Sequence, residues 1–450
     1  MTRDDATDHV DGSGPGGPPS GWVVADENEI VGPARLAQLA DRDPREVRPF
    51  LRAAEQPRAA ATAVDALAGS ASEDGPTPLL GDVVASVRRH EHPLVNEAAT
   101  RYFLAASRAA PAAVADHAAV FETMLRTGFS ADGADPLPLA DWREVQRVTA
   151  ALSVLVDDHP DAVAPAAGEL TAFVAGHLGQ ASLRLQVFET LTDAMVPDSP
   201  FGDVALGECP DYSAVEPTGR AHSLAPHAGD LARVTDRRNG QRGEWALLYA
   251  VALERPSAVA PHLDTVVDGW RRTSLGSRHW LFVSGILSLV ADARPRALRT
   301  HAEQVVAVAA RSLAEAAEDL AAADHPIEYP GDRDVFGTLW FLPVVLSVVA
   351  DIARACPRAT AAAFEQSSLR RRVRALGTEL WATVPGLVEA AADAPPAGTA
   401  ALLGLLAAIA DASGAFVGHH VDAVREIRAA ASDERVRAAA DRVLAAAGVE

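Results

Sequence analysis

Between Val145 and Leu191 the chain reads VQRVTAALSVLVDDHPDAVAPAAGELTAFVAGHLGQASLRLQVFETL. Before the break at His159-Pro160, apolar residues recur three and four positions apart: Val145, Val148, Leu152, Leu155 and Val156. A second stripe with the same period follows the break: Val163, Ala166, Ala167, Leu170, Phe173 and Val174. Such spacing places each set on one face of a helix. The stretch therefore predicts two helices of comparable length joined by a tight Pro turn.

The same plan recurs along the chain. PSAVAP at residues 256–261 repeats PDAVAP at residues 160–165, and Leu248 and Val251 precede it in the places of Leu152 and Leu155. Further breaks with apolar residues at matching positions lie at Pro111, Pro295, Pro357 and, with Gly in place of Pro, Gly414. A repeat of roughly 40–47 residues with two helices per unit is the pattern of HEAT and armadillo arrays.

A second motif opens some of the predicted helices. Asp433-Glu434-Arg435-Val436-Arg437 is the clearest copy, and His92-Pro93-Leu94-Val95 is a looser one. Helix, Pro turn and helix followed by Asp-x-x-Val-Arg resembles the HEAT repeat family, and in detail the HEAT proteins of halophilic archaea. The resemblance covers about residues 33–448, although the Asp and Arg are missing from most copies. It implies an all-α fold, a right-handed solenoid of HEAT-like antiparallel helix pairs. Each pair buries its apolar face by stacking on the next.

Composition divides the chain into a tail and an array. Residues 1–30 are acidic and rich in Gly and Pro, which predicts a disordered tail. Residues 31–450 form the predicted solenoid, interrupted by a long polar insertion at about 197–242 and a shorter loop at about 322–335. Long loops inside arrays are either functional or disordered. The alternative is that 197–242 hides a degenerate helix pair, since His222–Val234 could form a short helix.

The charge is strongly acidic, −21 at pH 7, and all 40 basic residues are Arg. Such a surface repels phosphate backbones. The acidic composition resembles that of proteins from organisms with a salt-rich cytoplasm. A GC-rich genome is the alternative, and it would explain the use of Arg in place of Lys but not the excess of acidic residues. Cys209 and Cys356 suggest neither a disulfide nor a zinc site. The longest apolar run, 338–350, is too short to span a bilayer, so we expect a soluble, cytoplasmic protein without membrane contact.

One cluster is strongly basic and is the candidate contact for phosphates or for a partner: Arg370, Arg371, Arg372 and Arg374. Arg237, Arg238 and Arg242 would join it only if the fold brings them together. One cluster does not offset the acidic background, so nucleic-acid binding is the disfavoured alternative.

Histidine-containing groups are weak metal candidates. His222, His227 and Asp230 share one short segment, but only His227 and Asp230 have helical spacing. His90-Glu91-His92 resembles one iron-binding dyad of HEAT-type deoxyhypusine hydroxylases, which use several dyads on successive repeats. His419-His420 is expected to begin an exposed helix. We therefore predict no metal site and no cofactor.

The chain contains none of the GxSxG, P-loop or HExxH motifs, and its Trp residues are expected to pack in the core. Solenoids present long surfaces that serve as scaffolds. The leading prediction is a non-enzymatic scaffold or adaptor for an unknown protein partner, argued from fold alone. The second is nucleic-acid binding through Arg370–Arg374. The third is an enzyme whose site is completed by the 197–242 loop.

Overall fold

The structure, a computed structural model, describes residues 23–26, 29–52, 56–70, 79–128, 139–177, 181–198, 212–235, 242–273, 278–322, 333–377 and 380–449. Contacts divide the chain into two compact units, Met1–Leu170 and Thr171–Glu450, which are described separately. Apart from one two-stranded hairpin, the elements of the described residues are helices, which confirms the all-α prediction. No helix in these ranges combines the length and apolarity that a membrane span requires.

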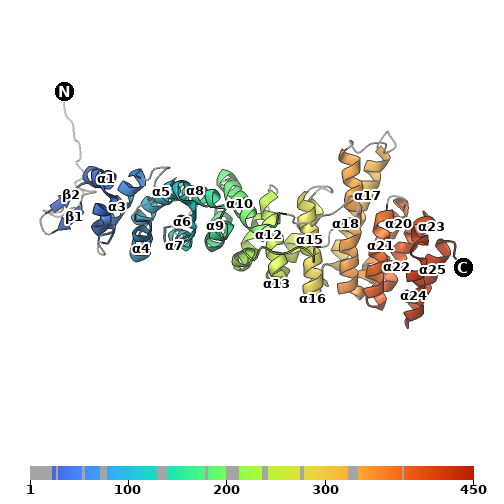
Figure 1. The fold of residues 1–450 in the computed structure, drawn as a ribbon. Helices are drawn as coiled ribbons and strands as arrows, with labels where there is room; N and C mark the ends of the chain where they lie inside the picture. Colours follow the sequence, from blue (N-terminus) through green and yellow to red (C-terminus); the bar gives the residue numbers. More distant parts are fainter. Residues whose placement is uncertain are drawn as a thin grey trace, which may run out of the picture. The chain divides into compact units, whose positions relative to one another are not determined.

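Unit 1 begins with two antiparallel strands and continues in helices (Figure 1). Its elements are β1 (Val23–Asp26), β2 (Glu29–Val31), α1 (Pro33–Arg42), the 3-10 helix η1 (Pro44–Val47), α2 (Arg48–Leu51), α3 (Pro57–Ser70), α4 (Leu80–His90), α5 (Pro93–Ala109), α6 (Pro111–Ala115), α7 (Ala119–Gly128), α8 (Leu139–Leu155) and η2 (Pro160–Ala162). The unit boundary falls within α9 (Ala164–Gly176).

Two rows of helices run through unit 1. In the first row α1 packs on α3, α3 on α5 and α5 on α8. In the second row α2 packs on α4 and α4 on α7. The rows are joined within pairs, because α2 contacts α3, α4 contacts α5 and α7 contacts α8. Each pair therefore buries its apolar face against the next pair, as a helical array requires.

Unit 2 contains the remaining helices (Figure 1). They are α10 (Ala181–Met195), η3 (Ala221–His227), α11 (Ala228–Thr235), α12 (Arg242–Glu254), α13 (Pro256–Val259), η4 (Ala260–His262), α14 (Leu263–Arg272), α15 (Arg278–Ala293), α16 (Pro295–Leu298), α17 (Ala302–Ala322), α18 (Arg333–Ala355), α19 (Pro357–Gln366), α20 (Leu369–Ala375), η5 (Trp381–Thr383), α21 (Val384–Asp393), α22 (Pro396–Ala410), α23 (Gly414–Gly418), α24 (Val421–Ala430) and α25 (Glu434–Ala446).

Within unit 2 the helices also pack in two rows. The first row runs α10, α12, α15, α18, α21 and α24, each packed on the next. The second row runs α11, α14, α17, then α19 with α20, then α22 and α25. The two rows are joined by contacts within five pairs: α11 and α12, α14 and α15, α17 and α18, α21 and α22, and α24 and α25. A face of the first row and a face of the second row are thus the two broad surfaces of this unit.

Helices end at a recurring junction residue, which is followed by Pro or, once, by Gly. At seven such residues φ lies between −132° and −153°, and the backbone N–H donates to the carbonyl four residues earlier; they are Asp43, Ala110, His159, Arg255, Arg294, Cys356 and Ser413. Pro disfavours helical ψ in the residue before it and is tolerated at the start of the next helix. The X-Pro pairs therefore end one helix and begin another.

Fully buried residues lie at fixed distances along the sequence from each junction residue. The residue seven positions before it is fully buried each time: Leu36, Phe103, Leu152, Leu248, Leu287, Val349 and Leu406. The residue four positions after it is fully buried too: Val47, Val114, Val163, Val259, Leu298, Thr360 and Val417. The Ser413 junction differs in one respect, because it follows the second-row helix α22 and not a first-row helix. The residues around Gly414 therefore match those around the Pro breaks, but this junction does not follow the first helix row as the others do.

The segment expected to be a polar insertion contains packed structure. Residues 221–235 form η3 and α11, which contact α12, and α11 also contacts α14. Leu224, Leu231 and Val234 are fully buried, and Tyr212 is 3 % exposed. The described residues of 197–242 thus agree with the alternative prediction, a helix hidden within this segment. Residues 199–211 and 236–241 lie outside them.

Two other expected boundaries differ from the structure. Residues 23–26 and 29–30, placed in the disordered tail by composition, belong to the strands β1 and β2, in which Val23 pairs with Val31. Residues 1–22 lie outside the described residues. In the loop expected at 322–335, α17 extends to Ala322 and α18 starts at Arg333, and residues 323–332 lie outside the described residues.

Both predicted helix-opening motifs do open helices. Asp433 is the N-cap of α25, and its carboxylate accepts a hydrogen bond from the Arg435 backbone N–H at 2.8 Å. Capping by Asp satisfies one of the free N–H groups at a helix start. His92 caps α5 in the same way through Nδ1, 3.2 Å from the Leu94 nitrogen.

Candidate functional site

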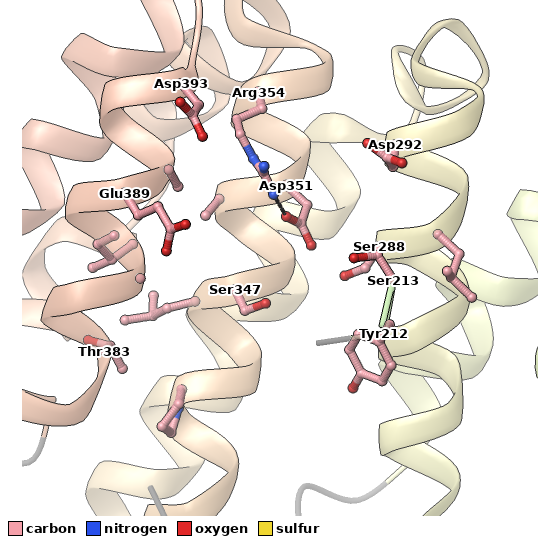
Figure 2. Close-up of a pocket in the computed structure, with 17 residues that line it drawn as sticks. Tyr212, Ser213, Ser288, Asp292, Ser347, Asp351, Arg354, Thr383, Glu389 and Asp393 are labelled. Atoms are coloured by element: carbon pink, nitrogen blue, oxygen red, sulfur yellow. Dashed lines mark hydrogen bonds and ion pairs between the residues drawn. The ribbon is translucent and has the colours of Figure 1, made fainter. Parts of the chain in front are cut away.

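A pocket of about 430 Å³ lies on the first row of unit 2, between α15, α18 and α21 (Figure 2). Its polar lining consists of Tyr212, Ser213, Ser288, Asp292, Ser347, Asp351, Arg354, Thr383, Glu389 and Asp393. Apolar side chains complete the wall: Leu289, Pro343, Leu346, Ala350, Leu387 and Ala390. Three successive first-row helices and the segment that begins at Tyr212 thus form one concave site.

Helical periodicity explains which residues face the pocket. On α18 the lining positions 343, 346, 347, 350, 351 and 354 are three, four, seven, eight and eleven residues from the first. Residues at such spacings share one face of a helix. The opposite face of α18 is packed in the core, where Val345, Val348 and Val349 are fully buried. One helix therefore serves both the core and the pocket.

The deepest charge in the pocket is a carboxylate on α18. Asp351 pairs with Arg354 one turn later, and the side chains are 16 % and 45 % exposed. Burial raises the pKa of Asp351, while the Ser288 hydroxyl and the Arg354 guanidinium oppose this shift and Asp292 adds to it. Removing a carboxylate from water disfavours its charged form. Asp351 therefore holds its proton more tightly than an ordinary Asp.

The remaining acidic groups lie nearer the solvent. Figure 2 shows Glu389 and Asp393 extending from α21 on one side of Asp351 and Asp292 from α15 on the other. These three side chains belong to exposed residues and form no ion pair with the residues that the structure describes. With four carboxylates and one guanidinium, the pocket has a formal charge of −3 when all are ionised. It is therefore chemically suited to a cationic group.

The described residues contain no group of three or more His, Cys, Asp or Glu side chains arranged to hold a metal ion. The carboxylates of the pocket come from three helices and do not converge as a ligand set.

The predicted Arg cluster lies elsewhere, on the second-row helix α20, which packs between α17 and α22. Arg374 pairs with Asp411, and the Arg370 guanidinium lies against Gly404, where an added Cβ would come within 2.8 Å of it. Arg371 is exposed, and Arg372 is half-buried. Two members of the cluster thus hold α20 against α22. Arg237 and Arg238 lie outside the described residues, and Arg242 begins α12.

The histidine candidates do not converge. His227 Nδ1 lies 3.4 Å from Asp230, which also pairs with Arg233 at 3.0 Å, while His222 is exposed. The Asp230 carboxylate thus serves as a local ion-pair partner within its own turn.

The His90-Glu91-His92 segment forms a helix-to-helix turn. Glu91 adopts φ +41° as the C-cap of α4, and His92 is the N-cap of α5. His419 is the C-cap of α23 and His420 is the N-cap of α24, so the pair lies at a helix start as the sequence predicts. Both His-rich motifs are therefore explained by backbone geometry at helix ends.

Trp residues divide between core and surface. Trp245, Trp270 and Trp280 are buried, as the core expectation requires. Trp381 is not, because it begins the 3-10 helix η5 and is 59 % exposed, more than any other large apolar side chain described. Thr383, which lines the pocket, lies in the same short helix. Its sequence context, beside a predicted helix, gave no sign of this exposure.

The sequence did not predict the buried ion pair between Arg184 and Glu244. Arg184 on α10 and Glu244 on α12 approach to 3.7 Å, with side chains 8 % and 0 % exposed. Two lone charged residues on predicted helices look like ordinary surface positions. Only the stacking of α10 on α12 brings them together in the core.

Comparisons with known proteins leave the family open. No protein-family model matches the chain. No curated protein matches it either. Among solved structures, the crystal structure of an engineered protein aligns over 90 % of this chain and 99 % of its own, with 14 % sequence identity and a TM-score of 0.42. Similarity at this level assigns neither a family nor a function.

Proposed function

We propose that this protein is a non-enzymatic scaffold that binds a protein partner through the first-row face formed by α15, α18 and α21. The observation that carries the proposal is the acidic pocket of about 430 Å³ on this face. Concave sites with a few polar groups among apolar side chains are typical of binding sites. The pocket also spans three successive pairs, so one ligand segment would contact several repeats.

Trp381 supports the proposal independently. A large aromatic side chain that is 59 % exposed is a feature typical of interface hot spots, where Trp is enriched. It lies two residues before Thr383 of the pocket lining. The proposal therefore assigns the pocket and Trp381 to one contact surface.

The finer architectural proposal is a right-handed, HEAT-like solenoid. The two-row packing, the X-Pro junctions and the burial register support the HEAT-like helix pairs, and the right-handed twist is what the HEAT resemblance implies. The acidic, Lys-free composition supports adaptation to a salt-rich cytoplasm. Nucleic-acid binding through Arg370–Arg374 gains no support, since Arg374 pairs with Asp411 and Arg370 packs on α22.

Affinity capture from native cell extract at multimolar salt tests the binding proposal. Wild type is compared with Ser347→Trp, which places an indole in the pocket from a half-buried position on α18. Glu318→Trp on the exposed side of the second-row helix α17 is the matched control. We expect a defined protein that is retained by wild type and the control, lost with Ser347→Trp and insensitive to nuclease. Capture that depends on nucleic acid, or is equal for all three proteins, would overturn the proposal.

A further inference from the structure

The pocket carries a second polar feature besides its carboxylates. Ser288 on α15 lines the pocket and is only 8 % exposed, and its Oγ has no hydrogen-bond partner at normal distance among the described residues. The hydroxyl also acts on the Asp351 carboxylate, whose pKa it lowers. Buried hydroxyls normally have hydrogen-bond partners, and the Ser288 hydroxyl faces the cavity, so it is available to a ligand that also reaches Asp351.

We propose that the pocket receives a single arginine side chain from a basic segment of the partner protein, its guanidinium reaching Ser288 and the carboxylates of α18 and α21. The inference rests on the proposed function and specifies the chemistry of the partner.

Charge favours this ligand. Arg354 already places one guanidinium on Asp351, one turn away on the same helix. Glu389, Asp393 and Asp292 have no ion-pair partner among the described residues. An incoming cation would therefore find three further carboxylates, on helices that flank Asp351 on both sides (Figure 2).

Shape favours arginine over lysine. A guanidinium is planar and has five donors, so it can reach carboxylates from two helices and a hydroxyl together, whereas an ammonium is a compact point charge. The apolar wall, which includes Pro343, Leu346 and Leu387, suits the methylene stem of a long basic side chain. The exposed indole of Trp381 offers a face on which a further cation of the segment can stack.

Three fluorescein-labelled, capped Gly/Ser heptapeptides test the proposal against the full-length protein. Their central residue is arginine, its neutral isostere citrulline, or lysine. Fluorescence anisotropy is recorded at a salt concentration that preserves the native circular dichroism spectrum. We expect the arginine peptide to bind at least tenfold more tightly than the citrulline peptide. A lysine peptide should bind several-fold more weakly than the arginine peptide. Equal binding of arginine and citrulline, or of arginine and lysine, would overturn the assignment to arginine.

Variants identify the site. Glu389→Gln/Asp393→Asn should lose about tenfold in affinity for the arginine peptide, and Ser288→Ala several-fold. Glu318→Gln/Glu426→Gln removes two exposed carboxylates outside the pocket and should bind as wild type. Unchanged binding by the pocket variants, with folding verified by circular dichroism, contradicts the inference.

The same variants separate this inference from the proposed function. If a partner is captured through the pocket face, as judged by Ser347→Trp, yet Glu389→Gln/Asp393→Asn captures it equally well, the arginine inference fails and the scaffold proposal stands. If capture does not depend on Ser347, the scaffold proposal itself fails.

Discussion

Tyr212 donates its phenolic hydroxyl to the Leu281 carbonyl of α15, 3.2 Å away. The ring of Tyr212 also lies against Gly285, where an added Cβ would come within 2.7 Å of it. These contacts fix Tyr212 to the helix that forms one wall of the pocket. A segment with the composition of a polar insertion is therefore part of the core and of the candidate site.

Deleting residues 200–240 should consequently unfold much of unit 2. The deletion removes η3, α11 and Tyr212, and with them the fully buried Leu224 and Leu231. We expect a large loss of helical circular dichroism and of cooperative melting, because α12 and α14 lose an apolar partner. A deletion variant that melts like wild type would restore the insertion hypothesis.

The buried pair Arg184–Glu244 should be costly to break from one side. Arg184→Leu removes the Arg184 guanidinium from beside Glu244, which is 0 % exposed, and should destabilise the protein by up to about 3–5 kcal/mol. Replacing both residues by apolar ones, Arg184→Met with Glu244→Leu, should recover most of this loss. Urea-unfolding midpoints at native salt measure both effects. A double variant as unstable as the single one would show that charge burial is not the cause.

Asp351 predicts a specific pH dependence. Its folded-state pKa is raised by burial above the unfolded value, so its contribution to stability is full below the unfolded pKa and is lost as pH rises through the folded pKa. Asp351→Asn should therefore raise the melting temperature by roughly one to three degrees near pH 7. The difference should disappear below about pH 4. Asp393→Asn, at an exposed position of the same pocket, is the control and should show no such difference; a lower melting temperature for Asp351→Asn at pH 7 would contradict this account.

Lowering the salt concentration should destabilise the protein. The net charge of −21 is self-repulsive, and screening shortens from about 30 Å at 0.01 M to about 3 Å at 1 M salt. We expect the melting temperature to fall steeply between molar and 0.05 M potassium chloride. An unchanged melt across this range would count against adaptation to high salt.

The helix ends were predictable because the chain marks them locally. Pro after His159, Arg255 or Arg294 ends one helix and begins the next whatever the tertiary context. The apolar residues beside these junctions, such as Leu152 and Val163, are buried as their spacing indicates. Local signals therefore sufficed for element type and for most of the core.

The hidden helix and the pocket depend on contacts that are distant in sequence. Pro226 and Gly229 interrupt the apolar pattern of 221–235, so burial there becomes visible only when α12 and α14 cover it. The pocket joins Ser288, Asp351 and Glu389, which lie far apart in the sequence on three different helices. Nothing in the local sequence of any one of them distinguishes it from other polar residues on helix faces.

The most direct test of the account maps where a partner touches the chain. Because the chain contains no Lys, amine-reactive cross-linkers have no side-chain target, so a photoreactive amino acid is placed at Gly386 instead. Gly386 lines the pocket and has open space around its Cβ position. A matched variant carries the same group at Glu318 on α17. On irradiation in native extract, we predict an adduct at residue 386 with one protein, through a peptide that contains arginine, and none at residue 318. Equal labelling at both positions, or no adduct at residue 386, would contradict the assignment of the α15–α18–α21 face as the binding surface.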